Sequence, residues 1–60
     1  MTELQIRKLG EIEGTRQGQN LHTAARYAVL REYSLGNIAN SHEMLAYLDE
    51  MNKARAEAMK

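Results

Sequence analysis

Sixty residues without cysteine or proline, and with eight acidic side chains balancing eight basic ones, make one small domain at most. Disulfides and thiolate metal sites are excluded, so a domain of this size needs association with another chain to supplement a thin core. The zero formal net charge also argues against binding that relies wholly on contacts to phosphate.

The first predicted helix covers residues 3–13. Thr2 followed by Gln5 has the form of a capping box at its start. Apolar residues then recur about three apart on one face, at Ile6, Leu9 and Ile12. Gly10 weakens the helix by about 1 kcal/mol relative to alanine. The alternation of apolar and polar residues at the start also suits a short strand, and this alternative stays open.

Residues 14–20 are predicted to form a loop, because they are polar, contain two glycines and carry no apolar side chain. The alternative is a continuous helix with a groove of small residues four apart, at Gly10, Gly14 and Gly18. Three glycines would cost such a helix about 3 kcal/mol of propensity. The loop is therefore preferred.

A second helix is predicted over residues 21–33, with Asn20 as its N-cap. One side of this helix carries Leu21, Ala24, Ala25 and Ala28. Leu30 lies on the opposite side, flanked by Tyr27 and Tyr33. Apolar side chains almost all round predict a central helix that is covered on two sides, one of them by another subunit.

Residues 34–40 are predicted to turn the chain, since Gly36 tolerates the left-handed backbone that ends helices. Asn40 followed by Glu43 resembles a capping box and marks the start of a third helix over residues 41–59.

This third helix carries a stripe of apolar residues at a spacing of three and four, which is a surface that needs to be covered. The stripe comprises Met44, Tyr47, Leu48, Met51, Ala54 and Ala58. It is shorter than the three or four heptads that identify a coiled coil. We interpret it as core, as a homodimer contact or as a face for a partner protein, to which methionine adapts easily. The predicted fold is all-α, with two or three short helices packed between the subunits of a homodimer.

We identify no catalytic, cofactor-binding or metal-binding residue. His22 and His42 lack the paired spacing of a zinc site. Ser34, Ser41 and Thr23 have no base and orienting acid at a recognisable spacing. The chain is therefore expected to be neither an enzyme nor a cofactor-binding protein.

A stretch without carboxylates separates Glu13 from Glu32, and three basic residues lie in or beside it: Arg16, Arg26 and Arg31. They are the expected contacts if the protein is a small dimeric DNA-binding regulator. A helix-turn-helix fits poorly, because the connection over residues 34–40 is longer than the three or four residues of that motif.

The favoured interpretation is a non-enzymatic interaction module, an adaptor or inhibitor that pairs with itself and binds or occludes a partner protein. By size and composition alone, the chain resembles the short accessory proteins of phages and plasmids. The expected partner or dimer interface comprises Tyr27, Leu30, Tyr33, Met44, Tyr47, Leu48 and Met51. We expect a cytoplasmic location without membrane attachment, because neither a signal peptide nor a run of roughly 18 apolar residues is present.

Overall fold

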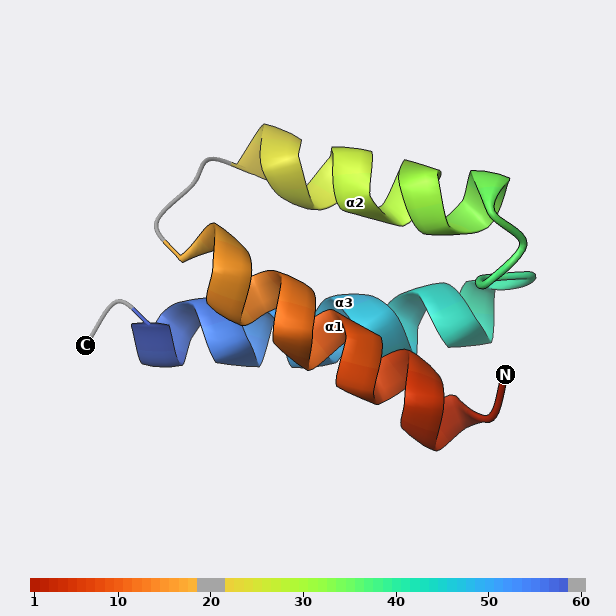
Figure 1. The fold of residues 1–60 in the computed structure, drawn as a ribbon, viewed down its shortest axis with the longest axis horizontal. Helices are drawn as coiled ribbons and strands as arrows, with labels where there is room; N and C mark the ends of the chain where they lie inside the picture. The colour runs from red at the N-terminus through yellow and green to blue at the C-terminus, as the bar shows by residue number, and fades with distance from the viewer. Residues whose placement is uncertain (19–21, 59–60) are drawn as a thin grey trace.

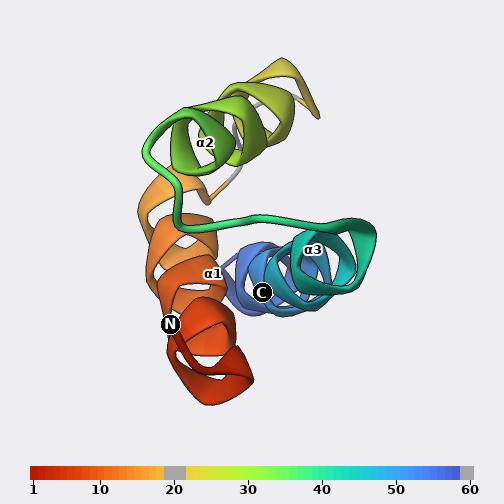
Figure 2. The same cartoon turned by 90° about the vertical axis from the view of Figure 1, so that its right-hand side faces the viewer.

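The computed structural model describes residues 1–18 and 22–58, which form three helices: α1 (Glu3–Gln17), α2 (His22–Ser34) and α3 (Ser41–Ala58). Helix α1 crosses α3 obliquely, and α2 lies along one side of this pair (Figure 1). The end-on view shows α2 as a separate layer above α1 and α3 (Figure 2). The predicted all-α class is confirmed for this part of the chain, and none of its helices is both long and apolar enough to cross a membrane.

The predicted N-caps of α1 and α3, Thr2 and Asn40, are confirmed. The hydroxyl of Thr2 accepts a hydrogen bond from the Gln5 backbone N–H at 3.2 Å, and the Gln5 side-chain oxygen accepts one from the Thr2 N–H at 2.8 Å. This is a complete capping box. At the start of α3 the Glu43 N–H donates to the Asn40 side-chain oxygen at 2.9 Å. Gly36 adopts a φ of +82° just after α2, as a helix-ending glycine does.

Helix α1 continues through the first part of the predicted loop. Residues 14–17 are helical, and the helix ends at Gly18, which has a φ of +57°. The prediction of a loop from residue 14 is therefore wrong, while the predicted cap Asn20 lies outside the described residues. Helix propensity favours a loop here, but propensity takes no account of contacts with other helices. Such a contact keeps residues 14–17 helical.

That contact is the close approach of the α1 and α3 backbones. An ideal Cβ on Gly10 would collide with the carbonyl oxygen of Tyr47. One on Gly14 would collide with the carbonyl oxygen of Met51 and lie 2.8 Å from the Ala54 Cβ. The sequence analysis preferred a loop to a helix with a groove of small residues. The structure shows this groove at Gly10 and Gly14, and α3 packs into it. The packing gained along the two backbones compensates for about 1 kcal/mol of propensity lost at each glycine.

The hydrophobic core lies mainly between α1 and α3. Its largest fully buried side chains are Ile6, Tyr47 and Met51. Helix α2 adds Ala25 and Ala28, and the connection to α3 adds Ile38. Within one chain, α2 completely buries only small apolar side chains and lies at the edge of the bundle, so the prediction that it is the central helix is wrong. Its expected cover by another subunit stays a prediction.

We expect Gly10→Ala and Gly14→Ala each to lower the free energy of unfolding by about 1–3 kcal/mol, although alanine is the better helix former. The added methyl group meets backbone atoms of α3, which cannot rotate away. Urea denaturation followed by circular dichroism measures the change. Thr15→Ala, at an exposed position of the same helix, is the control and should not lower stability. Unchanged stability in both glycine variants would contradict the close helix contact.

Candidate interaction surface

The outer side of α2 exposes three large side chains. Tyr27, Leu30 and Tyr33 are 69%, 58% and 64% exposed. They face solvent because Ala25 and Ala28, on the other side of the helix, pack into the core. We name the three exposed residues the α2 face. The sequence-based arrangement of this helix, with Leu30 opposite the alanines, is thereby confirmed, but the structure leaves the α2 face uncovered.

A groove of about 410 Å³ adjoins the α2 face, between α2 and the start of α3. Its apolar lining comprises Val29, Leu30, Tyr33, Ile38 and Met44. Ala39 and Asn40 of the connection and Ser41 at the start of α3 complete the wall. Leu30 and Tyr33 therefore belong both to the α2 face and to the groove, and the two form one continuous apolar surface.

The apolar stripe of α3 is divided between the core and this surface. Tyr47 and Met51 are only 1% and 0% exposed, because α1 of the same chain covers them. The expectation that these two side chains contact a partner is wrong for that reason. Met44 and Leu48 are half-buried and pack against the edge of the core. Met44 also lines the groove, and the other three residues do not.

The three arginines do not form one free basic patch. All three are exposed, but only Arg31 forms ion pairs with two buried carboxylates. Its guanidinium lies 2.7 Å from Glu13 and 3.4 Å from Glu32. Most of the positive charge that Arg31 would offer to a phosphate is thus used within the chain.

Glu13 and Glu32 belong to a buried polar network that ties α2 to its neighbours. Each is only 7% exposed. The Gln17 amide donates to Glu13 at 2.9 Å and to the carbonyl of Ala24 in α2 at 3.2 Å. The Asn37 amide donates to Glu32 at 2.6 Å. Sequence reasoning missed this network, because partners 18 residues apart, such as Glu13 and Arg31, carry no local pattern.

The network changes the acidity of its members. Burial is the largest single effect on Glu13 and disfavours its charged form, but the hydrogen bonds from Arg31 and Gln17 and the nearby positive charges together outweigh it. The positive charge of Arg16 acts in the same direction as these bonds, so the pKa of Glu13 lies below its ordinary value. The bond to Glu13 in turn raises the pKa of Arg31. Both groups are therefore charged at neutral pH.

The phenol of Tyr47 is buried beside the same network. Burial, followed by the negative charges of Glu13 and Glu32, raises the pKa of Tyr47 to about 12. Arg31 acts in the opposite direction and offsets part of this effect. Tyr47 is thus a neutral packing residue at physiological pH.

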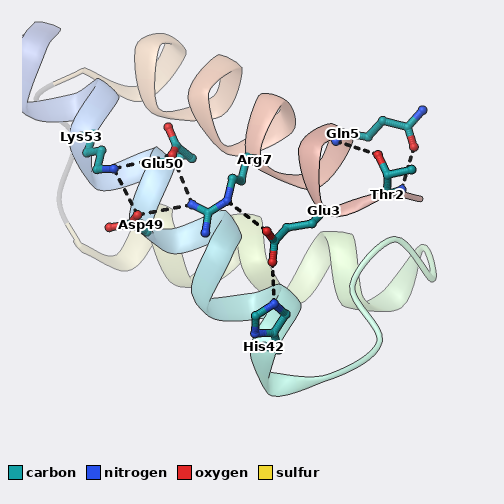
Figure 3. Close-up of polar contacts among 8 residues, drawn as sticks. All are labelled: Thr2, Glu3, Gln5, Arg7, His42, Asp49, Glu50 and Lys53. Carbon is teal, nitrogen blue, oxygen red and sulfur yellow. Dashed lines mark hydrogen bonds and ion pairs between the residues drawn. The ribbon is translucent and has the colours of Figure 1, made fainter.

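A row of ion pairs on the other side of the bundle joins α1 to α3 (Figure 3). The Arg7 guanidinium lies 3.4 Å from Asp49 and 3.2 Å from Glu50. Glu3 contacts both Arg7 and His42. Pairs as exposed as these contribute about 0–1 kcal/mol each, so they add little to the stability of the fold.

No cluster of three His, Cys, Asp or Glu side chains suited to a metal ion occurs within residues 1–18 and 22–58. His42 is paired with Glu3, and the side chain of His22 lies outside what the structure describes. Comparison with protein families, with curated proteins and with solved structures gives no match. The surface of α2 is therefore interpreted from its own geometry.

We expect Glu13→Gln to lower the free energy of unfolding at neutral pH by about 1–3 kcal/mol, because Arg31 then donates to a neutral amide and no longer to a carboxylate. A lowered pKa in the folded state gives stability that is present above the unfolded pKa and is lost as the pH falls through the folded pKa. The variant should therefore lose less stability on acidification than the parent chain. Urea titrations from neutral to acid pH test this. Glu11→Gln, on the exposed side of α1, is the control and should retain the parent's pH profile.

Ionisation of Tyr47 should destabilise the fold at alkaline pH. Because its pKa is raised from about 10 to about 12, stability is fully present below the unfolded pKa and is lost as the pH rises toward the folded one, by about 2–3 kcal/mol. Tyr47→Phe should flatten the decline of unfolding free energy over this interval. Tyr33→Phe, at an exposed tyrosine, should leave it unchanged, and equal profiles for the two variants would contradict the assignment.

Proposed function

We propose that the protein is a cytoplasmic, non-enzymatic interaction module that binds or occludes a surface of a partner protein, as an adaptor or inhibitor does, and that also associates with itself. The observation that carries this proposal is the α2 face. Tyr27, Leu30 and Tyr33 form a row of large exposed side chains on one helix. Exposed apolar patches mark interaction sites, and tyrosine is enriched among the residues that dominate binding energy.

The surroundings of the α2 face support binding to a protein. The groove beside it is lined by apolar and uncharged residues, which suits an inserted apolar side chain. Arg26 is exposed on the same helix, and Glu32, the carboxylate of α2, is turned into the buried network. A partner surface that is apolar at its centre and acidic at its edge therefore complements the α2 face.

The second candidate is a small dimeric DNA-binding regulator. The exposure of Arg16 and Arg26 favours it. The pairing of Arg31 with Glu13 at 2.7 Å weakens it, because fewer free cations per subunit mean fewer phosphate contacts and a smaller electrostatic contribution.

Capture from a native lysate on the immobilised chain, with the bound proteins quantified by mass spectrometry, tests the proposal. We expect specific partners to remain bound in moderate salt, because apolar burial dominates. The double variant Tyr27→Ala with Tyr33→Ala should reduce their recovery at least about tenfold. Alanine keeps the helix propensity, and both sites are exposed, so folding should be unaffected. Leu4→Ala, at an exposed site on α1, is the matched control.

Equal recovery by the double variant and the control would contradict the proposal. Titration of the same proteins with duplex DNA separates the second candidate. Binding that falls steeply with salt, weakens in Arg26→Ala and is unchanged by the tyrosine substitutions would favour the DNA-binding regulator instead.

A further inference from the structure

Helix α2 is attached to the rest of the fold through little buried apolar surface. Its fully buried apolar side chains are Ala25 and Ala28, and Val29 is partly buried beside them. The largest fully buried side chains all come from α1 and α3. Because buried apolar area is the main contribution to packing energy, the contact of α2 with its neighbours is weaker than the contact between α1 and α3.

Polar bonds between α2 and α1 complete the attachment. Arg31 donates to Glu13 at 2.7 Å, and the Gln17 amide donates to the Ala24 carbonyl at 3.2 Å. Detachment of α2 exchanges these bonds for bonds to water, so each holds the helix by only a small net free energy. Glu13 and Glu32 also regain the hydration that burial removes, which offsets much of their attraction to Arg31.

Helix α2 depends on this attachment for its own helical structure. It has 13 residues and no acidic side chain in its first turn, and a helix of this length is marginal by itself in water. Glycines with a left-handed backbone, Gly18 and Gly36, lie before and after it, so both connections contain a residue that changes direction at little cost. Once detached, α2 therefore loses its backbone hydrogen bonds as well.

The pair formed by α1 and α3 has contacts of its own that do not involve α2. At Gly10 and Gly14 the α1 backbone lies directly against carbonyl groups of α3, and Figure 2 shows α2 as a layer outside this pair. The ion pairs of Arg7 with Asp49 and Glu50 also join α1 to α3. None of these contacts is broken when α2 leaves.

We propose that α2 detaches from the pair of α1 and α3 and unfolds as one unit while the pair stays folded. Detachment dismantles the groove, because Leu30 and Tyr33 come from α2 and Met44 comes from α3. A partner that uses the groove therefore favours the closed form, and the equilibrium regulates its binding. Only this last step rests on the proposed function, since detachment itself is a property of the free chain.

Native-state hydrogen exchange, measured for each amide by NMR, tests the proposal. The hydrogen-bonded amides of α2 should exchange as a group, with protection factors at least about tenfold lower than those of α1 and α3. Their exchange should also depend less steeply on low concentrations of urea, because detachment exposes less surface than global unfolding. One common protection factor and one common urea dependence in all three helices would overturn the proposal.

Removal of the α1 cap distinguishes detachment from global unfolding. Thr2 caps α1 in both the closed and the detached form. Thr2→Ala should therefore lower the protection factors of α1 and α3 about fivefold, but leave those of α2 unchanged. Thr15→Ala makes the same substitution within α1, where it removes no cap, and should lower none of them. A parallel decrease in all three helices of Thr2→Ala would show that α2 opens only with the whole fold.

Removal of the Arg31 charge tests what holds α2 in place. Arg31→Gln leaves Glu13 and Glu32 buried without their cation in the closed form, whereas water solvates both in the detached form. The protection factors of α2 should fall at least about tenfold. Arg26→Gln removes an exposed arginine of the same helix and should leave them unchanged. Equal protection of α2 in the two variants would contradict the role of the buried carboxylates.

The outcomes separate this inference from the proposed function, because hydrogen exchange is measured on the free chain. Early exchange of α2 supports detachment even where no partner protein is captured. Uniform exchange overturns detachment, and the interaction module still stands in that case if partner capture depends on Tyr27 and Tyr33.

Discussion

The fold depends on the backbone contact between α1 and α3. Gly10 and Gly14 bring the first helix so close to the carbonyl groups of the third that no side chain fits between them. The two helices then act as a rigid pair that encloses Tyr47 and Met51. In a chain this short, a core must be built from few large side chains, and close approach of the helices is what excludes water from them.

The position of α2 follows from that pair. Its inward side offers alanines and a buried carboxylate, Glu32, which shares Arg31 with Glu13 of α1. Two buried carboxylates around one guanidinium hold the helix in place, while the alanines contribute little area. The large side chains of α2 are left on its outer side as a consequence. The inward orientation of the alanines and Glu32 thus completes the core and at the same time leaves the α2 face uncovered.

Much of the local structure could be predicted from the sequence. The capping residues Thr2 and Asn40 and the helix-ending Gly36 act through bonds to residues a few positions away, so short windows contain the information. The opposition of Leu30 to the alanines also follows from helical periodicity. The continuation of α1 beyond Gly14 did not follow, because helix propensity counts each glycine as a loss and cannot include the partner helix that compensates for it.

The sequence by itself indicated an all-α chain, the starts of α1 and α3, and which residues share a face, since these are properties of neighbouring residues and of the helical repeat. Only the tertiary structure decided which apolar face became core. Tertiary packing buries Tyr47 and Met51, although the apolar stripe of α3 alone was compatible with core or with a contact to a partner. It leaves Tyr27, Leu30 and Tyr33 exposed. The physical reason is that a helix face is buried by the surface that approaches it most closely. Because Gly10 and Gly14 have no side chain, α1 approaches α3 closely enough to cover the face that carries Tyr47 and Met51.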